Sequence, residues 1–381
     1  MPTPVDQDVP AVRPELDQNT AEVEQTPLRT NGFAPLRSYA AIGDGRTVAL
    51  VAQDGAIDWL PLPDLDSLPV FAAILDERNG GRLELIPTVA FESQRSYLTD
   101  TNVLQTTFTT AAGRVRVTDA LNVGVAGRLP WTELARRVDG IDGEVPMRWR
   151  VAPGTCFDTA SPWARQTPYG TVLRVQELSL GVCVSEGMDV ELTDQSAFGT
   201  FTVKAGERKV IGVIAAHAEP LMLSPVDDID RGIDRTVAAW RDWSAQFECA
   251  GDWHDAVRRS ALALKLLIFS PTGAIAAAAT TSLPESLAGG KNWDYRYAWI
   301  RDTAYALDAL RRFGLREETH ASISWLLRTL RDHGPELGVF YRLDGSESDG
   351  TTTHDVPGWH GIGPVTTGNP AGGQLQLGTF A

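Results

Sequence analysis

The sequence predicts two structural parts, an antiparallel β-sandwich over residues 37–225 and a helical part over residues 226–381. Up to about residue 220, short β-type runs alternate with turn residues, and no helical period comes between them. After Pro225, apolar residues recur at spacings of three and four, which indicates amphipathic helices. A length of 381 residues also fits a protein of two or three domains.

The first 36 residues are rich in Pro, Asp, Glu, Gln and Thr and show no sustained apolar period. Such a segment buries too little apolar surface to offset its ordering entropy, so residues 1–36 are expected to form a disordered tail. The sequence start lacks the basic and apolar regions of a secretory signal, and no apolar run reaches the length of a membrane span. These features predict a cytoplasmic protein with no membrane partner.

Alternation of apolar and polar residues supports the β-sandwich, because side chains in a strand point to opposite faces in turn. The pattern is clearest at 114–118 and 147–151, where apolar residues alternate with charged ones. Turn pairs such as Asp54-Gly55 separate the runs. The strands expected are 47–52, 56–60, 82–86, 114–118, 147–151, 171–175, 181–185, 189–192, 201–203 and 209–215.

A linker helix is expected within residues 226–250, over 230–247, and three further helices over 252–269, 303–313 and 316–331. Asp252 is expected to be the N-cap of the second helix. In the last of these helices, an apolar stripe is expected to face inward, formed by Ile323, Leu326, Leu327 and Leu330.

Beyond these helices, residues 333–369 form a Gly-rich connection without helical period, and loops of this length are usually functional. Residues 371–381 start another amphipathic pattern without a stop signal, so the sequence is expected to end inside a helix.

Composition excludes several classes of partner. The net charge of −15 opposes nucleic-acid binding, which requires a clustered basic surface. Cys156, Cys183 and Cys249 are too far apart in sequence to indicate a disulfide framework or a zinc site, and they are interpreted as small core residues. The six histidines show no metal-ligand spacing. The sequence therefore predicts no nucleic-acid partner, no metal and no cofactor.

The stretch 289–302 combines four aromatic residues with an adjacent Arg-Asp pair at the start of a helix. Flat rings cover the apolar faces of a pyranose, and charged side chains bind its hydroxyls through directional hydrogen bonds. Arg301 and Asp302 stand where the helical pattern begins, and a helix N-terminus keeps a carboxylate ionised. The stretch therefore predicts half of a glucose pocket, although Trp and Tyr are also ordinary core residues.

Glycoside hydrolysis requires two carboxyl groups at a fixed separation, one as general acid and one as base or nucleophile. The candidates near the aromatic stretch are Glu285, Glu336, Asp344 and Glu347. None stands in a context that distinguishes it, and Glu336 and Glu347 are interpreted as solvated loop acids.

Five segments carry a resemblance to a known family. The motif residues 280–285, 292–297 and 299–302 resemble the signature of glycoside hydrolase family 15, which contains glucoamylases and bacterial trehalases. Residues 42–60 are similar to the N-terminal β-domain of its bacterial members, and residues 368–377 also match the family pattern.

The resemblance implies a β-sandwich joined by a linker helix to an (α/α)6 barrel, with residues 251–381 as the first part of that barrel. It implies an inverting hydrolase that acts on the non-reducing-end glucose of an α-glucoside partner, which is a maltooligosaccharide, dextrin or trehalose. Carried over by position, the expected substrate-binding residues are Tyr295, Trp299, Arg301 and Asp302, with Tyr341 in the pocket wall.

In this family both catalytic glutamates lie in the later part of the barrel, so the general acid and base are expected beyond Ala381 and the barrel is expected to be incomplete. The matching position Glu285 is not used as the general acid in the family. The sequence by itself is then expected to be inactive. The alternative is a non-catalytic glucan-binding remnant or a truncated, inactive gene product.

Overall fold

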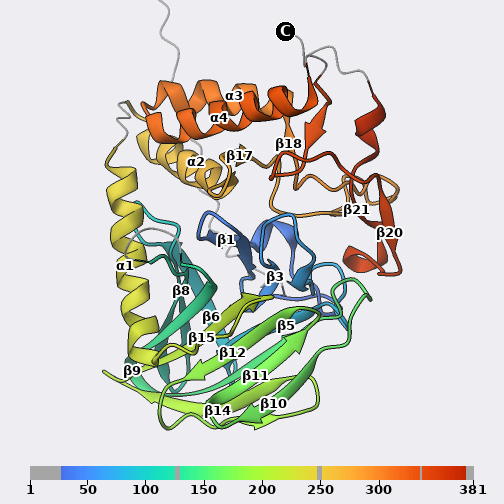
Figure 1. The fold of residues 1–381 in the computed structure, drawn as a ribbon. Helices are drawn as coiled ribbons and strands as arrows, with labels where there is room; N and C mark the ends of the chain where they lie inside the picture. Colours follow the sequence, from blue (N-terminus) through green and yellow to red (C-terminus); the bar gives the residue numbers. More distant parts are fainter. Residues whose placement is uncertain (1–26, 125–128, 247–250, 335–336, 375–381) are drawn as a thin grey trace, which may run out of the picture.

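The computed structural model describes residues 27–124, 129–246, 251–334 and 337–374. Residues 40–217 form a large antiparallel β-domain, and helices cover one end and one side of it (Figure 1). Within the described residues the β-domain has fifteen strands: β1 Ala40–Gly43, β2 Val48–Val51, β3 Ile57–Pro61, β4 Pro69–Phe71, β5 Gly81–Pro87, β6 Phe91–Tyr97, β7 Leu104–Thr110, β8 Gly113–Leu121, β9 Thr132–Pro153, β10 Trp163–Thr167, β11 Gly170–Val175, β12 Leu178–Val184, β13 Glu191–Leu192, β14 Ala197–Lys204 and β15 Arg208–His217.

Strand β9, 22 residues long, joins two sets of strands. Its first half pairs with β8 and β15, and its second half pairs with β5 and β14. The change of partners follows Gly143, whose φ of 67° lies in the left-handed region that favours glycine. The hydrophobic core contains residues of both sets, among them Leu83 and Trp149 of one set and Val117 and Leu180 of the other. The predicted antiparallel β-domain is thus confirmed.

The helical part contains α1 Val226–Ser244, α2 His254–Leu266, α3 Ile300–Arg312 and α4 Arg316–His333. Short strands lie between and after these helices: β16 Ile268–Phe269, β17 Ala274–Ile275, β18 Ala298–Trp299, β19 Phe340–Tyr341, β20 Thr352–His354 and β21 Val365–Thr367. The 3-10 turns η2 Trp359–Gly361 and η3 Pro370–Gly373 also follow α4, and a further 3-10 turn, η1 Leu36–Ser38, precedes β1. Figure 1 shows α2, α3 and α4 at the end of the β-domain and α1 along its side.

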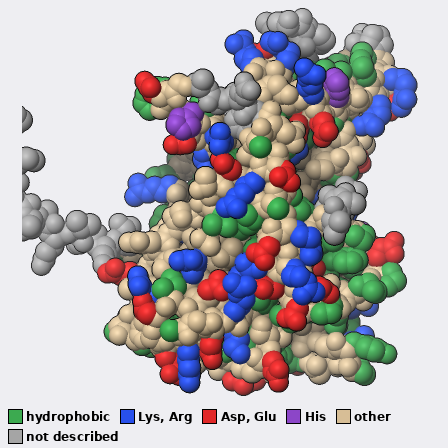
Figure 2. Space-filling model, turned by 90° about the vertical axis from the view of Figure 1, so that its left-hand side faces the viewer, with side chains coloured by type: hydrophobic (Ala, Val, Ile, Leu, Met, Phe, Trp, Pro, Cys, Tyr) green, Lys and Arg blue, Asp and Glu red, His purple; other side chains and the backbone are tan. Residues whose placement is uncertain are grey.

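Helix α1 is held against the β-domain by charged and apolar contacts. Arg137 of β9 donates to Asp230 at 2.5 Å and to Asp234 at 2.9 Å. Ile229 and Ile233 are fully buried against the sheet. On the face shown in Figure 2, acidic and basic side chains intermingle and form no basic patch. No helix in the described part of the chain is long and apolar enough to span a bilayer.

Three expectations about these elements are wrong. Residues 27–36 are not disordered, because Arg29 forms ion pairs with Asp54 at 2.5 Å and with the buried Asp58 at 2.8 Å. The rest of the predicted tail, residues 1–26, lies outside the described residues. Asp252 is not an N-cap, since α2 begins at His254 and Trp253 occupies the cap position.

The third correction concerns α4. Three residues of the predicted inward stripe face outward, since Ile323, Leu327 and Leu330 are 40%, 59% and 37% exposed. The fourth, Leu326, is half-buried and packs against the core as predicted. The inward face is instead polar and aromatic, and consists of Glu318, Ser322, Trp325 and Thr329. This orientation is set by contacts that only these residues can make, such as the bond from Ser322 to the carbonyl of Gly273 at 2.7 Å.

Candidate sugar-binding site

The predicted aromatic stretch runs in extended conformation between two other segments. On one side, the backbone of Ala277, Ala278 and Ser282 donates to carbonyls of residues 293–297 at 2.8–3.0 Å. On the other side, β18 pairs with β19, which places Trp299 opposite Phe340. Helix α3 then begins at Ile300.

Side chains along this extended segment alternate between a side that faces a cavity and a side that is buried. Trp293 and Tyr295 face a cavity, whereas Asp294 and Arg296 between them are 0% and 1% exposed. Successive side chains of an extended chain point to opposite sides, so one segment supplies both the cavity wall and its buried support. The same alternation explains why aromatic and charged residues are interleaved in the sequence.

Aromatic rings form the base of this cavity. Trp299 stacks on Phe340 with ring centroids 4.7 Å apart, and Tyr295 lies 5.5 Å from Trp299. Tyr297 packs edge-on against Phe340 at 5.2 Å. Trp299 is only 4% exposed, so its ring orientation is fixed by packing before any ligand arrives.

The cavity at Arg301 has a volume of about 280 Å³. Its lining comes from the aromatic stretch, from the first turn of α3 and from the segment around η3: Trp293, Tyr295, Trp299, Arg301, Asn369, Pro370, Ala371 and Gln374. Aromatic faces with a few convergent polar groups are typical of a small-molecule site. We call this space the Arg301 cavity.

Arg301 and Asp302 occupy the first turn of α3, as predicted, and Arg301 Nε donates to Asp302 Oδ1 at 2.8 Å. Their side chains are 42% and 41% exposed, so both retain accessible polar atoms. The helix N-terminus adds partial positive charge that stabilises the Asp302 carboxylate. Arg301 lines the cavity directly, whereas Asp302 does not line it and is connected to it through Arg301.

Tyr295 is oriented by a carboxylate. Its hydroxyl donates to Glu285 Oε1 at 2.6 Å. Burial, together with this hydrogen bond and the nearby negative charge, raises the pKa of Tyr295 to about 12. Tyr295 is therefore neutral at physiological pH and keeps its hydroxyl as a donor to Glu285.

Tyr341 does not join the other predicted residues. Its side chain is 2% exposed, and its hydroxyl accepts from the backbone N–H of Gly338 at 2.7 Å. It lines a neighbouring cavity of about 340 Å³, which shares Asn369 and Pro370 with the Arg301 cavity. The residue is fixed there because β19 pairs with β18 and its ring packs on His333, at a centroid distance of 4.8 Å.

The residues after β21 contribute to the cavity, although none was singled out as a binding residue. Asn369 accepts from the backbone N–H of Ala371 at 3.0 Å and thereby caps η3. An Asn directly before a Pro is a recognisable helix-start signal, because Pro suits the first helical position. The rest of the helix expected over 371–381 lies outside the described residues after Gln374.

Among the described residues, none of those that line the Arg301 cavity is Asp or Glu. Glu285 is hydrogen-bonded to Tyr295, and Asp344 accepts from its own loop at Ser346. Glu347 lies at the neighbouring cavity, and Glu336 is outside the described residues. Nor do three His, Cys, Asp or Glu side chains gather into a metal-binding group in the part of the chain that is described.

Two larger cavities, of about 660 and 690 Å³, lie on the β-domain beside β11 and β12. Both are lined by Tyr169 and Leu223 and by no carboxylate among the described residues. By volume alone, these two cavities would be the better candidates for a ligand site. The Arg301 cavity is the better candidate for a sugar because it combines stacked aromatic rings with an Arg at a helix start.

Comparison with known proteins indicates the family of the chain. Residues 24–219 match the family described as "Trehalase-like, N-terminal", and residues 251–381 match "Glycosyl hydrolases family 15". A trehalase of Thermoplasma volcanium is 32% identical over 361 residues, which cover 93% of this chain and 57% of the relative. A trehalase of Mycobacterium tuberculosis is 31% identical over 400 residues, covering 96% and 57%. The chain thus spans about 57% of the length of these curated relatives.

Among solved structures, a bacterial glucoamylase complexed with acarbose is similar, with a TM-score of 0.58 and 12% identity. The similarity covers 85% of this chain and 54% of that protein and concerns the fold alone. Two matches decide the assignment to a family. The trehalase-like N-terminal family covers about half of the chain, and glycosyl hydrolase family 15 covers the residues that follow. The chain belongs to glycoside hydrolase family 15 and carries its trehalase-like N-terminal domain.

Proposed function

We propose that this chain is part of an inverting α-glucoside hydrolase and that the Arg301 cavity binds the non-reducing-end glucose of its substrate. The observation that carries this proposal is the convergence of Trp299, Tyr295 and Arg301 on one cavity of about 280 Å³. Its volume suits a single sugar ring better than a long oligosaccharide, because drug-sized ligands occupy pockets of about 300–1,000 Å³.

Each group has a distinct task in this proposal. Trp299, held by its stack on Phe340, covers an apolar face of the pyranose. The guanidinium of Arg301 donates to sugar hydroxyls, and the Asp302 carboxylate, which lies outside the cavity lining, orients this guanidinium. The ion pair between the two keeps both charged groups in place before the sugar binds.

Inversion requires a general acid and a general base about 6.5–9.5 Å apart on opposite sides of the scissile bond. No such pair lines the Arg301 cavity within the described residues. We propose that both groups come from residues outside this chain, in the later part of an (α/α)6 barrel. The glucoamylase-like fold and the exposed apolar stripe of Ile323, Leu327 and Leu330 on α4 support further helices beside this one.

Trehalose is the substrate that the comparisons favour, because the curated relatives described above are named trehalases. The fold similarity to a glucoamylase leaves maltooligosaccharides as competing substrates for the experiment to separate.

The binding test is a calorimetric titration of trehalose, maltose and glucose into the purified chain and its Arg301→Ala variant. We expect trehalose to bind, and Arg301→Ala to weaken binding by about tenfold or more through loss of charge-assisted hydrogen bonds. Arg312→Ala is the matched control, since Arg312 lies on the same helix and pairs only with Asp308 in the described contacts. Equal affinities in wild type and Arg301→Ala would contradict the proposed site.

The catalytic part of the proposal has its own assay. We expect the chain to bind trehalose without releasing glucose, because no acid and base pair lines the cavity among the residues that the structure describes. Release of glucose that stops in Glu285→Gln would place a catalytic carboxyl within this chain and contradict the proposal. Binding of dextrins in preference to trehalose would instead favour a glucan-binding protein.

A further inference from the structure

The ion pair of Asp294 and Arg296 is the most deeply buried feature behind the Arg301 cavity. The two side chains are 0% and 1% exposed. Arg296 Nε and Nη2 donate to the two carboxylate oxygens of Asp294 at 2.9 and 2.8 Å. A bidentate pair of this kind fixes the plane of both groups as well as their distance.

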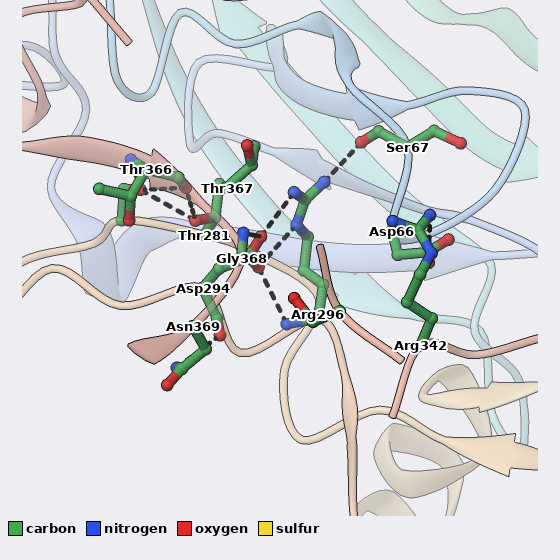
Figure 3. A network of polar contacts seen from close by, with 12 residues as sticks. Asp66, Ser67, Thr281, Asp294, Arg296, Arg342, Thr366, Thr367, Gly368 and Asn369 are labelled. Atoms are coloured by element: carbon green, nitrogen blue, oxygen red, sulfur yellow. Dashed lines mark hydrogen bonds and ion pairs between the residues drawn. The ribbon is translucent and has the colours of Figure 1, made fainter. Parts of the chain in front are cut away.

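Arg296 also contacts the β-domain. Its Nη1 donates to the backbone carbonyl of Ser67 at 2.5 Å, in the segment between β3 and β4 (Figure 3). The guanidinium thus uses one edge for Asp294 and a further N–H for the β-domain. A Lys ammonium at this position could not hold both carboxylate oxygens and the carbonyl in the same geometry.

Asp294 contacts the opposite wall of the sugar cavity. Its carboxylate accepts from the backbone N–H of Gly368 at 3.2 Å, and its carbonyl accepts from Asn369 Nδ2 at 3.0 Å. Asn369 in turn caps η3, so Asp294 is two hydrogen bonds away from Ala371, which lines the Arg301 cavity. Figure 3 shows the whole series, from Ser67 through Arg296 and Asp294 to Asn369.

We infer that Asp294 and Arg296 form a positioning pair, which transmits the docking of the β-domain to the wall of the Arg301 cavity. Neither side chain touches the sugar in this account. Their role is to hold residues 368–371 at the distance from Trp299 that the ligand requires. This inference rests on the proposed function only for the identity of the ligand, because the contacts themselves are independent of it.

The test compares Arg296→Lys with Asp66→Asn in the full chain. Lys keeps the positive charge beside Asp294 but cannot form the bidentate hydrogen bonds of the guanidinium. Asp66 pairs with Arg342 at 3.0 Å and joins the same β-domain segment to the helical part, yet neither residue lines the Arg301 cavity. Trehalose affinity is measured by calorimetry, and backbone hydrogen exchange is followed in residues 64–68 and 366–374.

We expect Arg296→Lys to weaken trehalose binding by about tenfold and to accelerate exchange in both segments, since small displacements of a binding group carry large penalties. Asp66→Asn should accelerate exchange only in 64–68 and bind trehalose as the wild type does. A folded Arg296→Lys protein with wild-type affinity and wild-type exchange in 366–374 would overturn the inference, as would equal loss of affinity in both variants.

Two further outcomes separate this inference from the proposed function. If the wild type binds no sugar, the proposed function fails, while the exchange of 366–374 in Arg296→Lys still decides the positioning role. If Arg296→Lys does not fold, exchange in the wild type decides it. Trehalose should then slow exchange in residues 64–68 of the β-domain, because coupling between two sites is reciprocal, and unchanged exchange there would overturn the inference.

Discussion

At the scale of single residues, the stretch 293–299 shows how one short segment supplies both the wall of a cavity and its buried support. Trp293 and Tyr295 face the cavity, and Asp294 and Arg296 are buried on the other side. The charges on the buried side are tolerated because they are paired and hydrogen-bonded. Substitutions on the two sides should therefore differ in kind, affecting ligand contacts on one side and cavity geometry on the other.

Tyr295 allows a prediction about ionisation. Its pKa of about 12 lies above the ordinary value of 10 because of burial and the Glu285 carboxylate. The difference between the spectrophotometric titrations of wild type and Tyr295→Phe should therefore show a tyrosine that ionises near pH 12. In Glu285→Gln the pKa of Tyr295 should fall, since the negative charge is removed while burial remains.

The sign of the linked stability effect follows from this shift. The protonated tyrosine is favoured in the folded state, so its contribution is complete below pH 10 and is lost as the pH rises towards 12. A Tyr295 that ionises near pH 10 in the wild type would show that its hydroxyl is not bonded to Glu285.

Much of the cavity could be predicted at this scale, because Tyr295, Trp299 and Arg301 are neighbours in sequence. The local pattern of rings and charges was enough to bring these three together. Asn369 and Ala371 could not be assigned to the same cavity, since about 70 residues separate them from the stretch and only tertiary contacts bring them there. Tyr341 lines the neighbouring cavity for a similar reason, because its position depends on the pairing of β19 with β18.

At the scale of elements, α4 is held by a buried carboxylate rather than by an apolar stripe. Glu318 is 5% exposed and accepts from Lys265 Nζ at 2.5 Å and from Trp243 Nε1 at 2.7 Å. One side chain thereby connects α4 to α2 and α1. Periodicity predicted the helix but not which face is buried, because a stripe of leucines and a face carrying Glu318 and Trp325 are both compatible with the period.

Glu318→Ala is therefore expected to lower the free energy of unfolding by about 2–3 kcal/mol. This is less than the cost of breaking a fully buried ion pair, because the side chain of Lys265 is 22% exposed. Urea denaturation measures the change. Asp308→Ala is the control, since Asp308 on α3 pairs with exposed arginines and should leave stability nearly unchanged. Equal effects of the two substitutions would contradict a supporting role for Glu318.

Glu318 also predicts an acid dependence. Burial alone would raise its pKa, but the charge of Lys265 and two hydrogen bonds outweigh burial and lower it below the ordinary value of 4.5. Its contribution to stability should therefore be present above pH 4.5 and lost as the pH falls through the lower folded-state pKa. The difference in unfolding free energy between wild type and Glu318→Ala should shrink over that range.

Strands show the same limit of prediction. Alternation identified much of the β-domain, yet β9 was recognised only in its second half, because Gly140 and Gly143 resemble turn residues. Strands β6 and β7 were missed, since polar residues such as Gln94 and Thr107 occupy much of their length. Pairing with neighbouring strands, rather than composition, makes these segments extended.

At the scale of the whole molecule, one hydrophobic cluster crosses from the β-domain into the helices. It includes Ile214 of β15, Trp240 of α1, Leu266 of α2 and Trp325 of α4. A hydrogen bond from Trp59 Nε1 to the Ala279 carbonyl, at 2.9 Å, crosses the same boundary. The sequence predicted two parts but not this continuity, since apolar periodicity does not show which elements meet.

A shared core predicts cooperative unfolding. Heat should unfold the two parts in one transition, with equal calorimetric and van't Hoff enthalpies. Differential scanning calorimetry of the wild-type chain measures both. Two resolved transitions, one for each part, would show that the boundary contacts are too weak to couple the β-domain to the cavity.

A crystal structure of this chain with trehalose would show whether the Arg301 cavity holds the terminal glucose. We predict one pyranose ring against Trp299, with its hydroxyls within hydrogen-bond distance of Arg301. Sugar bound instead in the larger cavities beside Tyr169, with the Arg301 cavity empty, would contradict the claim.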